Sequence, residues 1–191
     1  MLPETADHTH RSHPKKNATG IIIGIDPGLE RTGYAVLDVS GSVQRLLEAG
    51  FVRLNPTHNL ASRLAELADA MRHILETRRP GLVACEALYA HYKHPRTAIL
   101  MAHARGVILA EAARAGAQVL DVSATQVKKS LTGNGRASKT QIQRAVAGAL
   151  RLNELLEPHD VADAAAIALC GANLDRIHSG LADSRAVGAA T

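Results

Sequence analysis

The chain has 191 residues, 46% of them hydrophobic, and a formal net charge of +4, with Cys85 and Cys170 as its cysteines. That length and composition predict one domain with a sizeable core, and two cysteines in apolar segments argue against a disulfide framework. No apolar run is long enough to span a membrane and the N-terminus lacks a signal-peptide core, so we expect a cytoplasmic protein. The mild positive charge favours a nucleic acid as partner.

The first part of the chain predicts a polar tail followed by strands. Residues 1–18 lack apolar periodicity and are expected to be disordered. Residues 20–26 are apolar on both faces, which predicts a central strand that a proline–glycine pair ends. Residues 33–38 and 43–54 complete a three-stranded meander with short connections.

Helical and strand patterns then alternate. Asn59 is expected to cap a helix with a leucine-rich stripe, and residues 81–86 form a fourth strand. The helix expected at about 96–115 is apolar nearly all round, which indicates burial on more than one side, and part of its surface could be a subunit interface. A fifth strand follows at residues 118–122.

The last part of the chain is predicted to be helical. Ser138 begins a helix with a capping box, and the final helix runs from about Asp160 to Ile177. The order of elements predicts an α/β fold, a mixed five-stranded sheet with helices on both faces, in a domain spanning residues 19–178. Residues 179–191 are expected to be a flexible C-terminal tail.

Four carboxylates in three separated segments carry the functional signal. Asp26 ends the first strand, Glu86 ends the fourth, and Asp160 and Asp163 share one face at the start of the last helix. If these ends converge, the acids would repel one another by roughly 4 kcal/mol per pair at about 4 Å and an effective dielectric near 20. A divalent cation removes that conflict, and oxygen-only ligands suit Mg²⁺ or Mn²⁺ rather than zinc. The pattern therefore points to phosphoryl chemistry.

Each acid also has a purely structural interpretation. Asp26 could cap a tight turn, and Glu86 could be a surface glutamate just past a buried strand. Asp160 and Asp163 could complement the dipole of the helix that they begin. The metal interpretation is favoured for the set, because the predicted topology would bring all four acids together.

Tyr89 stands out because the aromatic residues of the chain are one Phe and three Tyr, so that any exposed aromatic is conspicuous. It follows Glu86 by three positions, and a loop tyrosine beside an acidic cluster suggests a base-stacking wedge. Packing under the loop is the alternative. His159, next to Asp160, could assist the acids by hydrogen bonding.

Residues 133–140 come near the P-loop pattern that cradles phosphates. A serine replaces the second glycine of that motif, and a short helical stretch rather than a strand precedes it, so nucleotide binding is not favoured. Flexible glycines, Arg136, Lys139 and free amides at a helix N-terminus suit a DNA phosphate instead. Lys128 and Lys129 extend this basic surface.

Several stretches together match one known family. In chain order they are Gly24-Ile25-Asp26-Pro27-Gly28 with Thr32-Gly33-Tyr34, Glu86 with an aromatic residue three positions on, Ala104-Arg105-Gly106, Gln126-Val127-Lys128, Gly133-Asn134-Gly135 with Lys139, and Asp160-Val161-Ala162-Asp163-Ala164. Over roughly residues 20–178 the chain resembles the RuvC family of bacterial Holliday-junction (crossover-junction) endonucleases. A single short motif is weak, but the ordered series is strong.

The resemblance implies an RNase H-like fold, a homodimer, and two Mg²⁺ ions in each active site, for which Mn²⁺ can substitute. By family motif, the expected metal ligands and catalytic acids are Asp26, Glu86, Asp160 and Asp163. Lys128 and Lys139 match basic positions implicated in DNA contact and catalysis, and Tyr89 falls where relatives commonly have phenylalanine next to the junction point.

The resemblance also implies an activity and partners. Four-way junction DNA would be cut by paired, symmetric nicks that leave 5′-phosphate and 3′-hydroxyl ends, in DNA recombination and repair, together with the RuvA–RuvB branch-migration machinery. One departure is the pair Ala102-His103, which lies where the family usually has Gly-Gln before Ala-Arg-Gly. This change could alter dimer packing or DNA contact, but not the chemistry.

Three other functions compete with this one. An RNase H-like nuclease of the YqgF type, acting on RNA, would use a similar first-strand motif. A phosphotransferase of the actin and sugar-kinase type also opens with an Asp-x-Gly hairpin, but such chains are usually longer and contain a repeated subdomain. A non-catalytic junction-binding protein is the third alternative.

Overall fold

The computed structural model describes residues 19–88 and 95–188, except for the side chains of residues 95 and 178–188. In that part of the chain there are five strands and five helices. In chain order they are β1 (Ile21–Asp26), β2 (Arg31–Asp38), β3 (Arg45–Arg53), α1 (Leu60–Arg78), β4 (Leu82–Glu86), α2 (Pro95–Arg114), β5 (Gln118–Val122), α3 (Ala124–Thr132), α4 (Lys139–Leu150) and α5 (His159–Gly188).

The strands form one mixed sheet in the order β3-β2-β1-β4-β5. The meander of β1, β2 and β3 pairs antiparallel, whereas β4 pairs parallel to β1 and β5 pairs parallel to β4. The parallel strands are joined through α1 and α2, as crossover connections require. The carboxyl ends of β1 and β4 therefore lie side by side at one end of the sheet.

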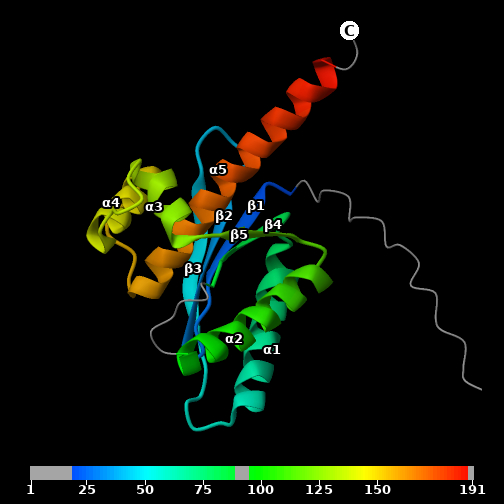
Figure 1. Cartoon of the computed structure of the whole chain (residues 1–191), viewed down its shortest axis with the longest axis vertical. Coiled ribbons are helices and arrows are strands. Elements are labelled where there is room, and N and C mark those ends of the chain that lie inside the picture. The colour runs from blue at the N-terminus through cyan, green and yellow to red at the C-terminus, as the bar shows by residue number, and fades with distance from the viewer. Residues whose placement is uncertain (1–18, 89–94, 189–191) are drawn as a thin grey trace, which may run out of the picture.

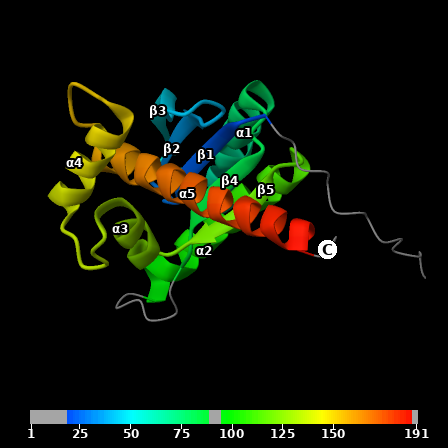
Figure 2. The ribbon, with the colours of Figure 1, turned by 90° about the horizontal axis from the view of Figure 1, so that it is seen from above.

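Helices cover both faces of the sheet, as predicted (Figure 1). Alternate residues of the strands point to opposite faces, so Ile23 and Ile25 of β1 pack against α1 and α2. Ala35 and Leu37 of β2 point the other way and pack with α3, α4 and α5. Seen from above, α5 crosses the strands on this second face (Figure 2).

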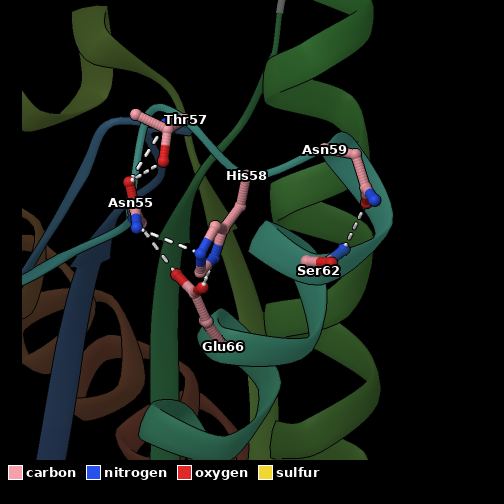
Figure 3. Close-up of polar contacts among 6 residues, drawn as sticks. All are labelled: Asn55, Thr57, His58, Asn59, Ser62 and Glu66. Carbon is pink, nitrogen blue, oxygen red and sulfur yellow. Dashed lines mark hydrogen bonds and ion pairs between the residues drawn. The ribbon is translucent and has the colours of Figure 1, made fainter.

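Most helix starts are explained by their capping residues. The Asn59 side chain accepts a hydrogen bond from the backbone N–H of Ser62, which fixes the first turn of α1 as predicted. The loop before it is held by Glu66, whose carboxylate contacts His58 and accepts from the backbone N–H of Asn55 (Figure 3). These contacts fix the connection from β3 to α1.

The predicted elements agree with the structure, with two differences. The order predicted from sequence left out α3, which is only nine residues long. In addition, α5 continues to Gly188 rather than ending near Ile177, since no proline interrupts residues 178–188. Residues 1–18 lie outside the described part of the chain, and the domain limits remain a prediction.

Two further expectations concern the cysteines and membrane-spanning segments. Cys85 and Cys170 are free and fully buried, which confirms that they are small core residues. Among the described residues no helix combines the length and hydropathy that a membrane span requires.

Candidate active site

Asp26 and Glu86 are brought together by strand pairing. The parallel register aligns Ile25 of β1 with Cys85 of β4, so the next residue of each strand lies at the same sheet end. Beyond Asp26, Thr32 locks the turn into β2, because its buried hydroxyl donates to the Gly28 carbonyl and accepts from the Gly28 N–H. Both carboxylates are half-buried at this end of the sheet.

Asp160 and Asp163 reach the same place because α5 packs directly on the strand backbone. A Cβ on Gly33 of β2 would come within 3.0 Å of the Asp160 backbone, and a Cβ on Gly24 of β1 would come equally close to the backbone of Ala164. Glycine at both positions lets the helix approach this closely. The first turn of α5 therefore lies over the end of β1 and the start of β2.

Burial and mutual repulsion raise the pKa of three of these acids. The pKa of Asp26 rises to about 8, first because the group is buried and then because Glu86, Asp163 and Asp160 lie close to it. The pKa of Glu86 is also raised, first by burial and then by the charge of Asp163. A hydrogen bond between the two side chains adds to the rise at Asp26 and partly offsets the rise at Glu86, which assigns the proton to Asp26. The pKa of Asp163 is also raised, chiefly by burial.

The fourth carboxylate has a different partner. The Oδ2 atom of Asp160 is screened from solvent and lies 3.1 Å from Nε of Arg31. The contact is an ion pair only, because Oδ2 accepts no hydrogen bond. Asp160 therefore keeps a buried oxygen with unused acceptor capacity at the edge of the acidic cluster.

Lys128 of α3 and Lys139 of α4 lie on the other side of the acids. Together with Glu86 and Asp163 they line a cavity of about 280 Å³. Burial is the largest influence on the pKa of both acids and raises it, while the two lysine charges partly offset that rise. The structure thus brings both predicted lysines to the carboxylates.

The other predicted residues are less closely tied to the cluster. Lys129 and Arg136 are exposed and do not line the cavity. At the start of α4 the capping box uses the backbone N–H groups of Ser138 and Gln141. The Nδ1 atom of His159 lies 2.9 Å from the side-chain nitrogen of Gln143, and His103 is on the exposed face of α2. Tyr89 lies outside the described residues.

Two arginines that support the acids were not singled out from the sequence. Arg31 pairs with Asp160, and Arg105 of α2 donates from Nε to the carbonyl oxygen of Glu86 at 3.0 Å. Arg105 also contacts Asp121 of β5, so it fixes the end of β4 from the opposite face. Its place in the Ala-Arg-Gly stretch was the available signal.

The acidic cluster fits a hard divalent cation. Its donors are carboxylate oxygens, and Asp160 offers a buried oxygen without a hydrogen bond. Burial first, and then the nearby acidic charges, raise the pKa of Asp26, Glu86 and Asp163, and a bound cation would relieve both effects. Within residues 19–88 and 95–188, no three Asp, Glu, His or Cys side chains have the arrangement of a completed metal site. In this arrangement Asp26 interacts with Glu86, and Asp160 pairs with Arg31.

Asp26 gives a prediction for the stability of the metal-free protein. Its folded pKa of about 8 exceeds the ordinary value of 3.8, so the folded state binds an extra proton between these pH values. The resulting stability is present at low pH and is lost as the pH rises towards 8, at up to about 1.4 kcal/mol per pH unit. Urea unfolding in chelator from pH 5 to 9 should show this decline, and Asp26→Asn should flatten it. Equal slopes for the two proteins would contradict the coupling.

The fold and the site together define a class of protein. A mixed sheet of this order, with acids at the adjoining ends of β1 and β4 and on a helix packed across them, is the arrangement of the RNase H-like nucleases. The prediction of an RNase H-like fold from the sequence is confirmed.

Comparison with known proteins narrows the class to one family. The family model described as crossover junction endodeoxyribonuclease RuvC matches residues 22–171. A relative of that name from Rhodopirellula baltica is 48% identical over 157 residues, which covers 82% of this chain and 88% of the relative. The chain belongs to the RuvC family.

Solved structures agree with this assignment. The Thermus thermophilus RuvC structure superimposes with a TM-score of 0.77 at 33% identity and covers 83% of this chain and 96% of its own. T. thermophilus RuvC in complex with Holliday junction substrate gives a TM-score of 0.75 at 31% identity, covering 82% and 96% of the two chains.

Proposed function

We propose that this protein is an endonuclease that resolves four-way DNA junctions, in DNA recombination and repair, by metal-dependent hydrolysis at the four carboxylates. The observation that carries the proposal is the meeting of Asp26, Glu86, Asp160 and Asp163 at one end of the sheet in a chain of the RuvC family. The junction complex of the T. thermophilus relative supports the choice of substrate.

The cofactor is proposed to be Mg²⁺, with Mn²⁺ as a substitute and two ions in each active site. The four carboxylates would hold these ions, and the buried oxygen of Asp160 offers one coordinating atom that needs no broken hydrogen bond. When bound, such ions activate water and stabilise the departing oxygen of a phosphodiester. Products with 5′-phosphate and 3′-hydroxyl ends are expected.

The protein side chains then have separate tasks. Asp26 and Glu86 must lose their shared proton before both can act as ligands, so deprotonation of Asp26 is required for full activity. Lys128 and Lys139 face the acids across the cavity, where they can bind the phosphate and neutralise charge that builds on its oxygens. Lys129 and Arg136, exposed nearby, are proposed to contact DNA, as is Tyr89.

A homodimer is proposed to form through the outer face of α2. A groove of about 650 Å³ lies there between α1 and α2, and it is lined mostly by small and apolar residues, among them Ile99, Ala102, Gly106 and Ala110. Ile99, which is 57% exposed, adds a large apolar side chain to this groove, and a contiguous exposed apolar patch marks an interaction site. A two-fold axis here would give the two sites that paired nicks require.

Ile99→Asp should break this dimer, because it buries a charge in the interface. Ile177→Asp is a matched control, since Ile177 on α5 is 56% exposed and far from the groove in sequence. Light scattering after gel filtration should report a dimer for the wild type and the control and a monomer for Ile99→Asp. A monomeric wild type, or a dimeric Ile99→Asp protein, would contradict dimer formation through this groove.

A gel assay tests the proposed function. A labelled four-way junction and a linear duplex of the same sequences are incubated with the protein, with Mg²⁺ or with chelator. Paired cuts in the junction alone, only with Mg²⁺, are expected. Binding without cleavage in Mg²⁺ or Mn²⁺ would favour a non-catalytic junction-binding protein, and preferential hydrolysis of RNA would favour a YqgF-like nuclease. The RuvA–RuvB partnership and the cytoplasmic location remain predictions.

A further inference from the structure

One surface next to the carboxylates has no role in the chemistry described so far. Phe51, the single phenylalanine of the chain, is 39% exposed on β3, which is an edge strand of the sheet. Its register partner on β2 is Gly33, the residue on which the first turn of α5 rests. The exposed ring therefore lies on the same face of the sheet as Asp160, one strand away from it.

Two arginines accompany this ring. Arg31 of β2 and Arg53 of β3 are directly opposite each other in the antiparallel register, and both are exposed. Residues two apart in a strand point to the same face, so Arg31 and Arg53 project with Phe51. The guanidinium carbon of Arg31 lies 5.8 Å from the centre of the Phe51 ring, within the range of a cation–π contact.

The charges on this surface are not balanced. Like charges at directly opposite positions of a strand pair are unfavourable, and only Arg31 has a partner, namely Asp160. No side-chain hydrogen bond or ion pair is seen between Arg53 and any described residue. At the other end of β3, by contrast, Arg45 is paired with Asp38 at 2.5 Å. The excess positive charge on β3 is therefore confined to the end beside the acidic cluster.

We propose that Arg31, Phe51 and Arg53 form a contact surface for the DNA strand next to the cleaved phosphate. Arginines bind phosphate, and an exposed ring stacks on an unpaired base, which is the combination that single-stranded nucleic acid recognises. This surface adjoins Asp160, which pairs with Arg31, whereas the lysine-lined cavity adjoins Asp163. The two therefore lie on opposite sides of the carboxylates. Cations held by Asp160 would compete with Arg31 for the Asp160 carboxylate. The guanidinium of Arg31 would then be free to contact DNA.

This inference rests on the proposed function, and it is tested by junction binding without cleavage. Fluorescence anisotropy in chelator would measure the affinity of a labelled junction over a range of salt concentrations. Arg53→Gln should weaken binding severalfold at low salt and reduce the slope of log affinity against log salt by about 1. Phe51→Leu should weaken binding about tenfold and leave that slope unchanged, because stacking releases no counterions.

Arg45→Gln is the matched control, since it removes an exposed arginine from the same strand far from the acids. Its affinity and salt slope should equal those of the wild type. If Arg53→Gln and Arg45→Gln give the same values, or if Phe51→Leu binds as tightly as the wild type, the surface does not contact DNA. These results would contradict the contact surface but not the proposed function, as long as the wild type cleaves junctions in Mg²⁺. A wild type that binds junctions but never cleaves them would contradict the proposed function instead.

Discussion

Replacing Asp26 by asparagine should reduce junction cleavage by about three orders of magnitude while leaving junction binding nearly unchanged. Asp26 ends β1 beside the end of β4 and interacts with all three other acids, so the variant loses the central ligand. Each tenfold loss in rate corresponds to about 1.4 kcal/mol of lost transition-state stabilisation. Asparagine can still donate to Glu86 as the protonated Asp26 does, so the fold should be preserved.

The measurement is single-turnover cleavage of a labelled junction in Mg²⁺, with binding measured separately in chelator. Asp69→Asn is a suitable control, because Asp69 is an aspartate of α1 that is 75% exposed and that, within the described part of the chain, pairs with Arg72 of the same helix. That variant should cleave like the wild type. Cleavage by Asp26→Asn at the rate of this control would remove Asp26 from the active site.

Adding a single methyl group at Gly33 should damage both stability and activity. The Cβ of Gly33→Ala would come within 3.0 Å of the Asp160 backbone, which has no flexible end that could move aside. Overpacking of this kind costs about 1–3 kcal/mol, and here it must push the first turn of α5 away from the sheet. Because that turn carries Asp160 and Asp163, cleavage should fall at least tenfold even in protein that remains folded.

Urea unfolding and single-turnover cleavage measure the two effects. The control is Gly148→Ala in α4, an exposed helical glycine whose added Cβ would meet no atom within 4 Å. Alanine there should stabilise the protein by about 0.5–1 kcal/mol and leave cleavage unchanged. A Gly33→Ala protein as stable and active as the wild type would show that α5 does not need this close approach.

Much of the site was predictable because it lies where regular elements begin and end. Asp26 and Glu86 each follow a run of apolar residues, and parallel pairing of those runs then puts both carboxylates at one sheet end. Asp160 and Asp163 could be placed together from the helical repeat alone, because residues three apart in a helix lie on the same face. Periodicity and element ends are local signals, so they can be read from the sequence without coordinates.

The contacts made by Arg31 and Arg105 could not be predicted in the same way. Arg31 meets Asp160 across more than a hundred residues of sequence, and Arg105 reaches the carbonyl of Glu86 from the opposite face of the sheet. The Arg31 contact depends on how α5 packs on β2, and the Arg105 contact depends on how α2 packs against β4, and no local pattern encodes either packing. The exposure of Phe51 likewise follows from the position of β3 at the sheet edge.

The most direct test of the account is a titration of the metal-free protein with Mn²⁺, in which electron paramagnetic resonance reports the free ion. Two Mn²⁺ ions should bind to each chain at the carboxylates, more tightly as the pH rises through about 8, where Asp26 loses its proton. Asp26→Asn and Asp163→Asn should each weaken this binding by at least tenfold. Binding that is unchanged in both variants, or absent from the wild type at millimolar Mn²⁺, would contradict a metal site at the end of this sheet.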